Sequence, residues 1–216
     1  MKTKNQKKGM TYLFIGLIVI GIAGVAIVLS ARKSPLPDGP PGSAAVAENG
    51  LPGLQTGEAP WGAELGHLRE RLVRIGLPAL SEEGSGFHIH QYLALYLHGK
   101  ETEVPAGIGF NPVERFISPL HTHDASGIIH IESPTVEKYT LGQFFDVWGV
   151  RLSRNCVGGY CDNPSDRLRL FVNGSEKEGD PRDLELTDHL VIILTYGTSG
   201  ELPNPIPAGH TFPAGS

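Results

Sequence analysis

A run of twenty residues without a charged side chain, residues 10–29 (MTYLFIGLIVIGIAGVAIVL), constrains this chain more than any other feature. That is about the length of apolar helix that crosses a bilayer. Four lysines precede the run, and flanking lysines favour the cytoplasmic side. We therefore expect a cytoplasmic basic N-terminus (residues 1–9), a transmembrane helix (residues 10–30) and a localisation of the remainder outside the cytoplasm, at the cell membrane. A cleaved signal peptide is the alternative, although its apolar region is usually only about 7–15 residues long.

Charge and cysteine content exclude several classes of protein. The chain has 18 lysines and arginines against 23 acidic residues, a net charge of -5. Four of the basic residues precede the apolar run, so residues 31–216 carry 14 basic and 23 acidic side chains, a net charge of -9. Nucleic acid is excluded as a partner because its recognition needs a basic surface. Two cysteines are too few for a disulfide-rich scaffold or a four-cysteine metal site.

Proline and glycine divide the outer part of the chain. Residues 31–60 are rich in Pro, Gly and Ala and lack apolar periodicity, which is typical of a flexible linker. Residues 198–216 form a second Pro/Gly-rich segment, a tail with no apparent core face. A single folded extracytoplasmic domain, residues 61–197, is expected between them.

The longest predicted strand covers residues 87–98, where side chains alternate with a period of two. One face is apolar, and the other carries histidine and tyrosine: His88, His90, Tyr92, Tyr96 and His98. Gly99-Lys100 predicts a turn, after which residues 101–109 can return as a second strand. Pro105 in that segment favours a sheet edge.

Further strands are predicted at residues 126–132, 168–172 and 190–194, the last apolar throughout, as a central strand would be. Two helices are predicted. The first covers residues 61–76, and the second is capped by Thr140 and Gln143 and buries an aromatic stripe ending at Trp148. Asp146, on the opposite side of the second helix, is expected in solvent.

This order of elements predicts an α+β fold. It resembles the β-grasp arrangement, a mixed sheet packed by one core helix, in element order only, and that resemblance implies no function. An all-β sandwich with one crossover helix is the alternative.

Histidine placement carries the functional prediction. Five of the nine histidines form two HxH pairs and one further position on a predicted strand. Alternate residues of a strand share one face about 7 Å apart, so such pairs can direct their imidazoles toward one ion. Asp124 directly follows the second pair and is either a ligand or the carboxylate that orients an imidazole. The predicted metal ligands are His88, His90, His121, His123, His130 and Asp124. Solvated or structural histidines and metal-free acid–base catalysis are the alternatives.

The identity of the metal is constrained less than its ligands. Imidazole suits zinc, copper, nickel and iron, and methionine occurs only at Met1 and Met10, which excludes a methionine-rich copper(I) site. An extracytoplasmic site made largely of imidazoles favours copper(II) or zinc as the cofactor. Cys156 and Cys161 close a short glycine-containing loop, for which a disulfide is expected outside the cytoplasm. A reduced pair acting as metal or redox ligands is the alternative.

Three functions follow. The first is a membrane-anchored domain that captures, buffers or passes on copper or zinc. The second is a metal-dependent enzyme with an open coordination position and Asp124 or Glu132 as base; no complete catalytic motif supports it, so binding is favoured. The third is an interaction module that docks a partner membrane protein through the histidine–tyrosine face or an edge strand.

Two strings of the sequence are familiar together: PLHTHDASGIIHIESP (residues 119–134) and TLGQFFDVWGV (residues 140–150). They resemble the LHTHD…GIIH…ESP and TLG-FFD-WG signature of a group of uncharacterised prokaryotic, membrane-anchored extracytoplasmic proteins. The resemblance covers about residues 86–197. It implies one folded outer domain on a tether and no particular activity.

Overall fold

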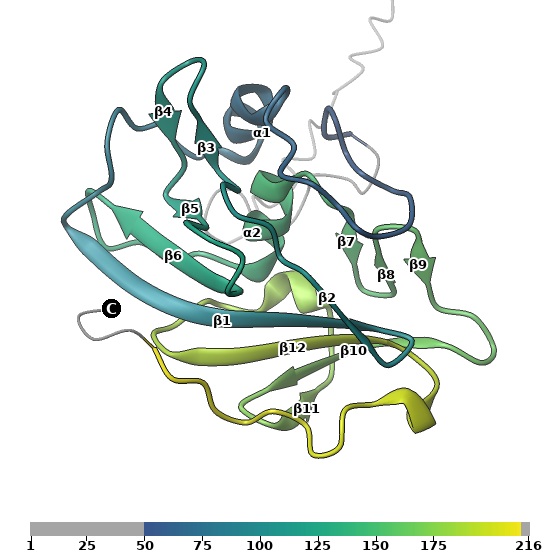
Figure 1. Ribbon diagram of the computed structural model, residues 1–216. Helices are drawn as coiled ribbons and strands as arrows, with labels where there is room; N and C mark the ends of the chain where they lie inside the picture. The colour runs from purple at the N-terminus through teal and green to yellow at the C-terminus, as the bar shows by residue number, and fades with distance from the viewer. Residues whose placement is uncertain (1–49, 213–216) are drawn as a thin grey trace, which may run out of the picture. The chain divides into compact units, whose positions relative to one another are not determined.

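The computed structural model describes residues 50–212. The predicted basic N-terminus, the transmembrane helix and most of the predicted linker lie outside the described residues. Among residues 50–212, no helix combines the length and the apolar character that crossing a bilayer requires. The domain is α+β, as predicted, with two α-helices and one large mixed sheet in the described part of the chain (Figure 1).

The large sheet has seven strands in the order β11-β10-β12-β1-β6-β5, with β2 paired beside β1. These strands are β1 (Phe87–Leu97), β2 (Lys100–Thr102), β5 (Leu120–His121), β6 (Ile128–Ser133), β10 (Arg167–Val172), β11 (Ser175–Lys177) and β12 (Leu190–Gly197). The β1–β12 pair is parallel and the others are antiparallel. The small sheets are β3 (Phe110–Asn111) with β4 (Phe116–Ile117), and β7 (Leu152–Ser153), β8 (Cys156–Val157) and β9 (Tyr160–Cys161).

Strand β1 confirms the predicted long strand, but the predicted return strand at residues 101–109 is wrong in length. Only β2 pairs back, against residues 95–97 of β1. The rest of that edge is already taken by β6, which pairs with residues 87–92. Pro105 also lacks the N–H that a continued ladder would need. The chain therefore leaves the sheet after Thr102.

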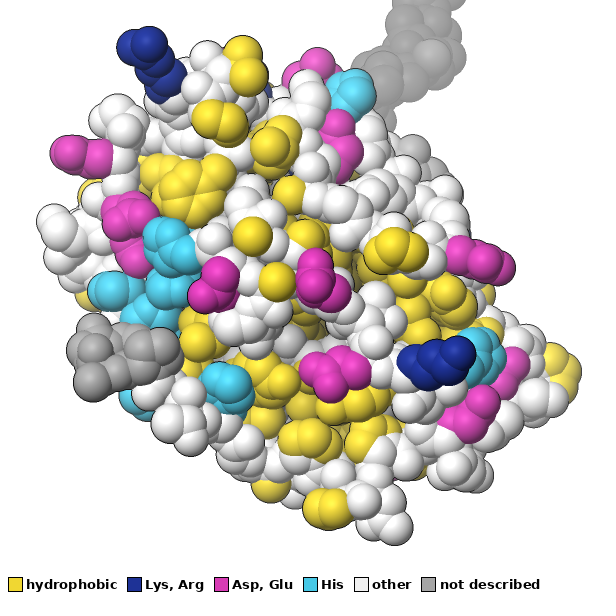
Figure 2. Space-filling model, viewed as in Figure 1, with side chains coloured by type: hydrophobic (Ala, Val, Ile, Leu, Met, Phe, Trp, Pro, Cys, Tyr) yellow, Lys and Arg dark blue, Asp and Glu magenta, His cyan; other side chains and the backbone are white. Residues whose placement is uncertain are grey.

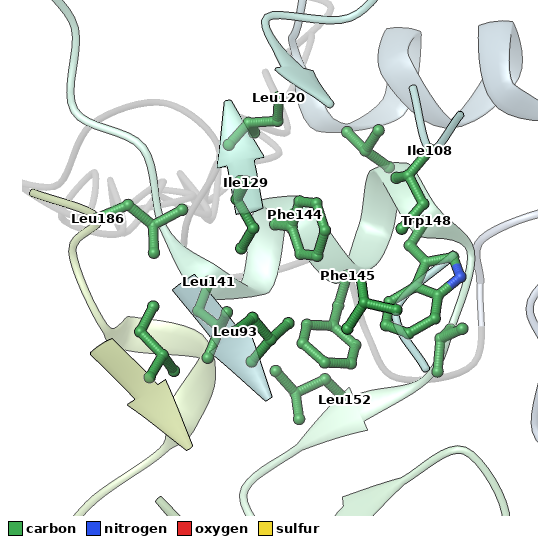
Figure 3. Close-up of a cluster of buried hydrophobic side chains, with 14 of the residues drawn as sticks. Leu93, Ile108, Leu120, Ile129, Leu141, Phe144, Phe145, Trp148, Leu152 and Leu186 are labelled. Atoms are coloured by element: carbon green, nitrogen blue, oxygen red, sulfur yellow. The ribbon is translucent and has the colours of Figure 1, made fainter. Parts of the chain in front are cut away.

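Helix α2 (Leu141–Trp148) covers one face of the sheet, and its first turn is fixed by the predicted capping box. The Thr140 side chain accepts the Gln143 N–H, and the Gln143 side chain accepts the Thr140 N–H. Figure 3 shows the helix side chains set among those of the strands. The fully buried members include Leu93, Ile129, Leu141, Phe144, Phe145 and Trp148. One sheet covered by a helix thus forms in place of the alternative all-β sandwich.

Helix α1 (Leu68–Ile75) ends at Gly76 as predicted but begins later than residue 61. Its Arg71 is fully buried and donates from Nε to the Asp146 carbonyl (2.8 Å) and from Nη2 to the Val147 carbonyl (3.0 Å). It also pairs with the Glu64 carboxylate. Asp146 is buried, contrary to the prediction of solvent exposure, because Arg182 of a 3₁₀ turn (Pro181–Asp183) packs there and pairs with its carboxylate. We call Glu64, Arg71, Asp146 and Arg182 the α2 polar network.

Ordered structure extends beyond residues 61–197 at both ends. On the N-terminal side, Gln55 donates its N–H to the Gly149 carbonyl (2.7 Å). On the C-terminal side, Leu202 and Ile206 pack on the second sheet face, and the His210 ring stacks on Tyr92 with centroids 3.9 Å apart. Figure 1 shows this yellow segment running along the sheet on the side away from α2. The described part of the predicted tail therefore covers a core face.

The predicted disulfide between Cys156 and Cys161 is present. The two residues pair across the β8–β9 hairpin, so the bond closes the turn between these strands.

Candidate metal centre

Strand register brings histidines from three neighbouring strands into one row. His90 of β1 lies opposite His130 of β6, and His130 lies opposite His121 of β5. In the next row, His88 lies opposite Glu132. Because Ile129 and Ile131 of β6 point into the α2 core, the alternating residues of β6 face the other way. The sheet face that α2 does not cover therefore carries the side chains of both rows: His88, His90, His121, His130 and Glu132.

A glycine sets the start of β6 and with it this register. Gly127 has a φ of +83°, and a Cβ at this position would lie 2.4 Å from the Leu93 carbonyl oxygen. That carbonyl belongs to β1, so the glycine permits a backbone approach that other residues would block. The Leu93 N–H in turn donates to the Gly127 carbonyl (2.8 Å). From this fixed point, the alternation of β6 places His130 beside His90.

All five predicted histidines meet in one place, which we call the histidine cluster: His88, His90, His121, His123 and His130. Figure 2 shows histidine side chains gathered in one surface patch, at the left of the view where β1 begins in Figure 1, with acidic side chains beside them. The outer members are open to solvent, with His88 45% and His123 40% exposed, whereas His121 is fully buried. One side of the cluster is therefore fixed in the protein interior, and the other side is accessible to an ion from solvent.

The nitrogen atoms of the cluster stand at ligand spacing. His90 Nε2 lies 3.0 Å from His88 Nε2 and 2.9 Å from His130 Nδ1. His121 Nε2 lies 3.3 Å from His123 Nε2. Two nitrogens bound at 2.0–2.1 Å to a tetrahedral ion are about 3.3 Å apart. The side chains therefore fit an ion without large rearrangement.

The buried imidazoles are held in the neutral form that binds metals. Burial, and after it the neighbouring His123, lowers the pKa of His121 to about 3. Burial and His123 likewise lower the pKa of His130 to about 3. Burial and His88 lower the pKa of His90 to about 4. At neutral pH these three rings are uncharged, and each offers a lone pair.

Hydrogen bonding decides which nitrogen of His121 is free. A carbonyl only accepts, so the contact of 3.1 Å between His121 Nδ1 and the Ser118 carbonyl requires a proton on Nδ1. Nε2 then carries the lone pair and faces the cluster, which is the arrangement found in metal-bound histidines. His90 differs, since its buried Nδ1 has no hydrogen-bond partner among the described residues. The protein alone leaves this polar atom unsatisfied, which costs free energy.

Glu132 belongs to the site although it was not among the predicted ligands. Its Oε1 lies 3.0 Å from His88 Nε2 and 3.5 Å from His130 Nδ1. Burial raises the pKa of Glu132, and the nearby Glu83 raises it further. Glu83 itself approaches His123, with 3.6 Å between Oε1 and Nε2. Alternation within β6 could have identified Glu132, which is two residues from His130, whereas no local pattern points to Glu83.

Asp124 is not brought into the cluster. Its exposed side chain accepts the N–H of Ser126 (2.9 Å) in the turn before β6, and it belongs to neither group of donors there. A separate group of His98, Asp166 and Glu201 lies at the far end of β1, with His98 exposed and the two acidic residues half-buried.

An apolar groove of about 500 Å³ adjoins the cluster. Phe110 and Glu83 line it and also contact the site; the Phe110 ring centroid lies 5.1 Å from that of His121. Comparison with protein-family models, with curated proteins and with solved structures finds no match to this chain. The functional argument therefore rests on the geometry of the site.

Proposed function

We propose that this chain is a membrane-anchored, extracytoplasmic protein that binds a transition metal, copper(II) or zinc, through the histidine cluster. The observation that carries the proposal is the convergence of five imidazoles, from three strands and the segment after β5, at nitrogen spacings that suit metal coordination. Copper(II) and zinc are preferred because the donors are imidazoles with one carboxylate and no thioether.

The location outside the cytoplasm is supported by two features. The uncharged run at residues 10–29, preceded by four lysines, has the length and flanks of an anchor. The Cys156–Cys161 disulfide is typical of an oxidising compartment. An N-terminal peptide retained in the membrane fraction, identified by mass spectrometry, would support the anchor, and its removal would favour a cleaved signal peptide.

The finer fold assignment is also a proposal. The parallel pairing of β1 with β12, beside the antiparallel β10, supports a β-grasp-like sheet with α2 as its core helix. Membership in the group that shares the LHTHD…GIIH…ESP signature is consistent with a single outer domain.

Metal binding is tested by dialysis of the full-length chain against micromolar zinc or copper(II), followed by elemental analysis. We expect bound metal in the wild type and at least a tenfold weaker affinity in His121→Ala. His67→Ala is the matched control, a half-exposed histidine before α1 that belongs to none of the groups of donors in the described residues, and should bind as the wild type does. Equal metal content in all three proteins, or none in any, would refute the proposal.

A further inference from the structure

The donors around the histidine cluster divide into two groups rather than one. The first group is His121, His123, His130 and Glu132, and the second is His88, His90 and His130. Within each group, the ligand atoms all lie within 4.8 Å of one another. Six donor side chains also exceed the four that a tetrahedral ion takes. One tetrahedral ion would need neither six donors nor two separate groups of them.

His130 is the member that both groups share, and it stands between them. In the sheet, β6 lies between β1, which carries His88 and His90, and β5, which carries His121. The rings of His90 and His123 both stand at 85° to the His130 ring, with centroids 4.4 Å and 4.3 Å away. Each group therefore presents one edge-on imidazole to the central ring. A neutral imidazole has one N–H and one lone pair, so His130 can bind two ions only as an imidazolate, after its ring N–H proton is released to solvent.

Glu132 also reaches both groups. Its Oε1 lies 3.0 Å from His88 Nε2 and 3.9 Å from His121 Nε2, although these two histidines are on strands at either side of β6. A carboxylate can bind through two oxygens. In this position its negative charge, together with that of a deprotonated His130, offsets part of the charge of two cations, since the other donors are neutral imidazoles.

We infer that the centre holds two divalent transition-metal ions that share His130, one bound by His88 and His90 and the other by His121 and His123, with Glu132 between them. This inference rests on the proposed function and makes it more specific. A single ion that selects four of the six donors is the competing arrangement. The two arrangements differ in how many ions the chain binds and in which variants lose them.

The stoichiometry is measured by native mass spectrometry of the full-length chain, loaded with zinc. We expect two zinc ions per wild-type chain, one in His88→Ala, one in His123→Ala and none in the double variant. Both side chains are substantially exposed, so neither substitution should disturb the fold. His67→Ala, a half-exposed histidine outside every group of donors in the described residues, should retain two ions.

The outcomes separate the inference from the proposed function. Saturation at one zinc per wild-type chain, lost in both single variants, would overturn the two-ion arrangement and leave metal binding intact. No bound zinc or copper(II) in any protein would overturn both.

Sharing of His130 is tested separately with copper(II). One equivalent should give the electron paramagnetic resonance signal of an isolated ion. Two equivalents should give a spin count clearly below that of two isolated ions, because copper ions joined by one imidazolate are magnetically coupled. Two additive, uncoupled signals would overturn the sharing of this ring.

Discussion

Two regions of this domain hold polar side chains inside the protein, and they satisfy them differently. In the α2 polar network, donors meet acceptors: Arg182 places Nη1 and Nη2 at 3.0 Å and 2.7 Å from the two carboxylate oxygens of Asp146, and Arg71 donates to carbonyls at the end of α2. In the histidine cluster, nitrogen faces nitrogen, and Glu132 is the one carboxylate within the groups of donors described there. The α2 polar network needs no ligand, because its donors meet acceptors within the protein. The histidine cluster instead brings together nitrogen lone pairs, which a metal ion can accept.

This difference separates stabilising polar groups from binding ones. A paired buried charge holds the fold, and removing one partner leaves the other uncompensated. Neutral imidazoles crowded at a surface do little for each other and are arranged for something that accepts their lone pairs. Substitution in the network should therefore affect folding, and substitution of the outer cluster residues should affect binding.

The largest effect is expected from Arg71→Ala. We expect it to lower the free energy of unfolding by about 3–5 kcal/mol, since it leaves the Glu64 carboxylate and two carbonyls at the end of α2 without their partner. The measurement is urea unfolding followed by circular dichroism. The control is Arg69→Ala on the same helix, half exposed and paired with Glu114, which should cost less than about 1 kcal/mol. Similar losses in the two variants would contradict the assignment of Arg71 to a buried network.

Acidification should destabilise the metal-free protein through the cluster. The pKa of His121 and of His130 is lowered to about 3, and that of His90 to about 4, so the unfolded chain takes up protons first as the pH falls below about 6.5. Stability is therefore complete above that pH and is lost on acidification. Between pH 6.5 and 5.5 we expect a loss of about 1 kcal/mol per imidazole, about 3 kcal/mol in total.

Glu132 acts in the opposite sense, because a carboxyl with a raised pKa is protonated more readily in the folded state. One carboxyl with a raised pKa thus opposes three imidazoles with lowered pKa values, so the net effect of acidification is still a loss of stability. Urea midpoints measured across this range with a chelator present test the slope. His121→Gln should reduce the slope by about one proton. A flat profile in the wild type would contradict neutral, buried imidazoles.

Added metal should stabilise the wild type by mass action. At a zinc concentration 100 times the dissociation constant, a single ion adds about 2.7 kcal/mol to the free energy of unfolding. Arg69→Ala should show the same gain, because α1 contributes no ligand to the cluster. His121→Ala should gain less than the wild type at that concentration, because it removes a ligand of one of the two groups. Thermal unfolding with and without zinc measures the difference, and an equal gain in His121→Ala would place the binding elsewhere.

Local sequence patterns predicted much of this architecture. The two-residue alternation of residues 87–98 identified β1 and its histidine face, and the Thr140–Gln143 capping box located α2. Both signals are local, since they depend on neighbours along the chain. The convergence of the histidines could be expected in part, because His88 and His90 alternate on one strand face, whereas His123 lies beyond the end of β5.

Features that depend on tertiary contacts were not predictable in the same way. Asp146 looked like a solvent-facing helix residue until Arg182, 36 positions later, packed against it. The return strand after β1 was cut short because β6 occupies that edge. Glu83 comes to His123 from a segment without regular pattern. In each case the deciding partner is distant in sequence.

The smallest expected effect on folding is that of His123→Ala, compared with its pair partner His121→Ala. His123 is 40% exposed, so its loss should change the metal-free free energy of unfolding by less than about 0.5 kcal/mol. His121 is fully buried and bonded to the Ser118 carbonyl, so its truncation should cost about 1–3 kcal/mol. Both should weaken zinc binding at least tenfold, because both are ligands of the same group. Urea unfolding in chelator and zinc titration measure the two effects. If His123→Ala instead destabilised the metal-free protein by more than 1 kcal/mol and left zinc affinity unchanged, the cluster would resemble the α2 polar network, and the contrast between the two regions would fail.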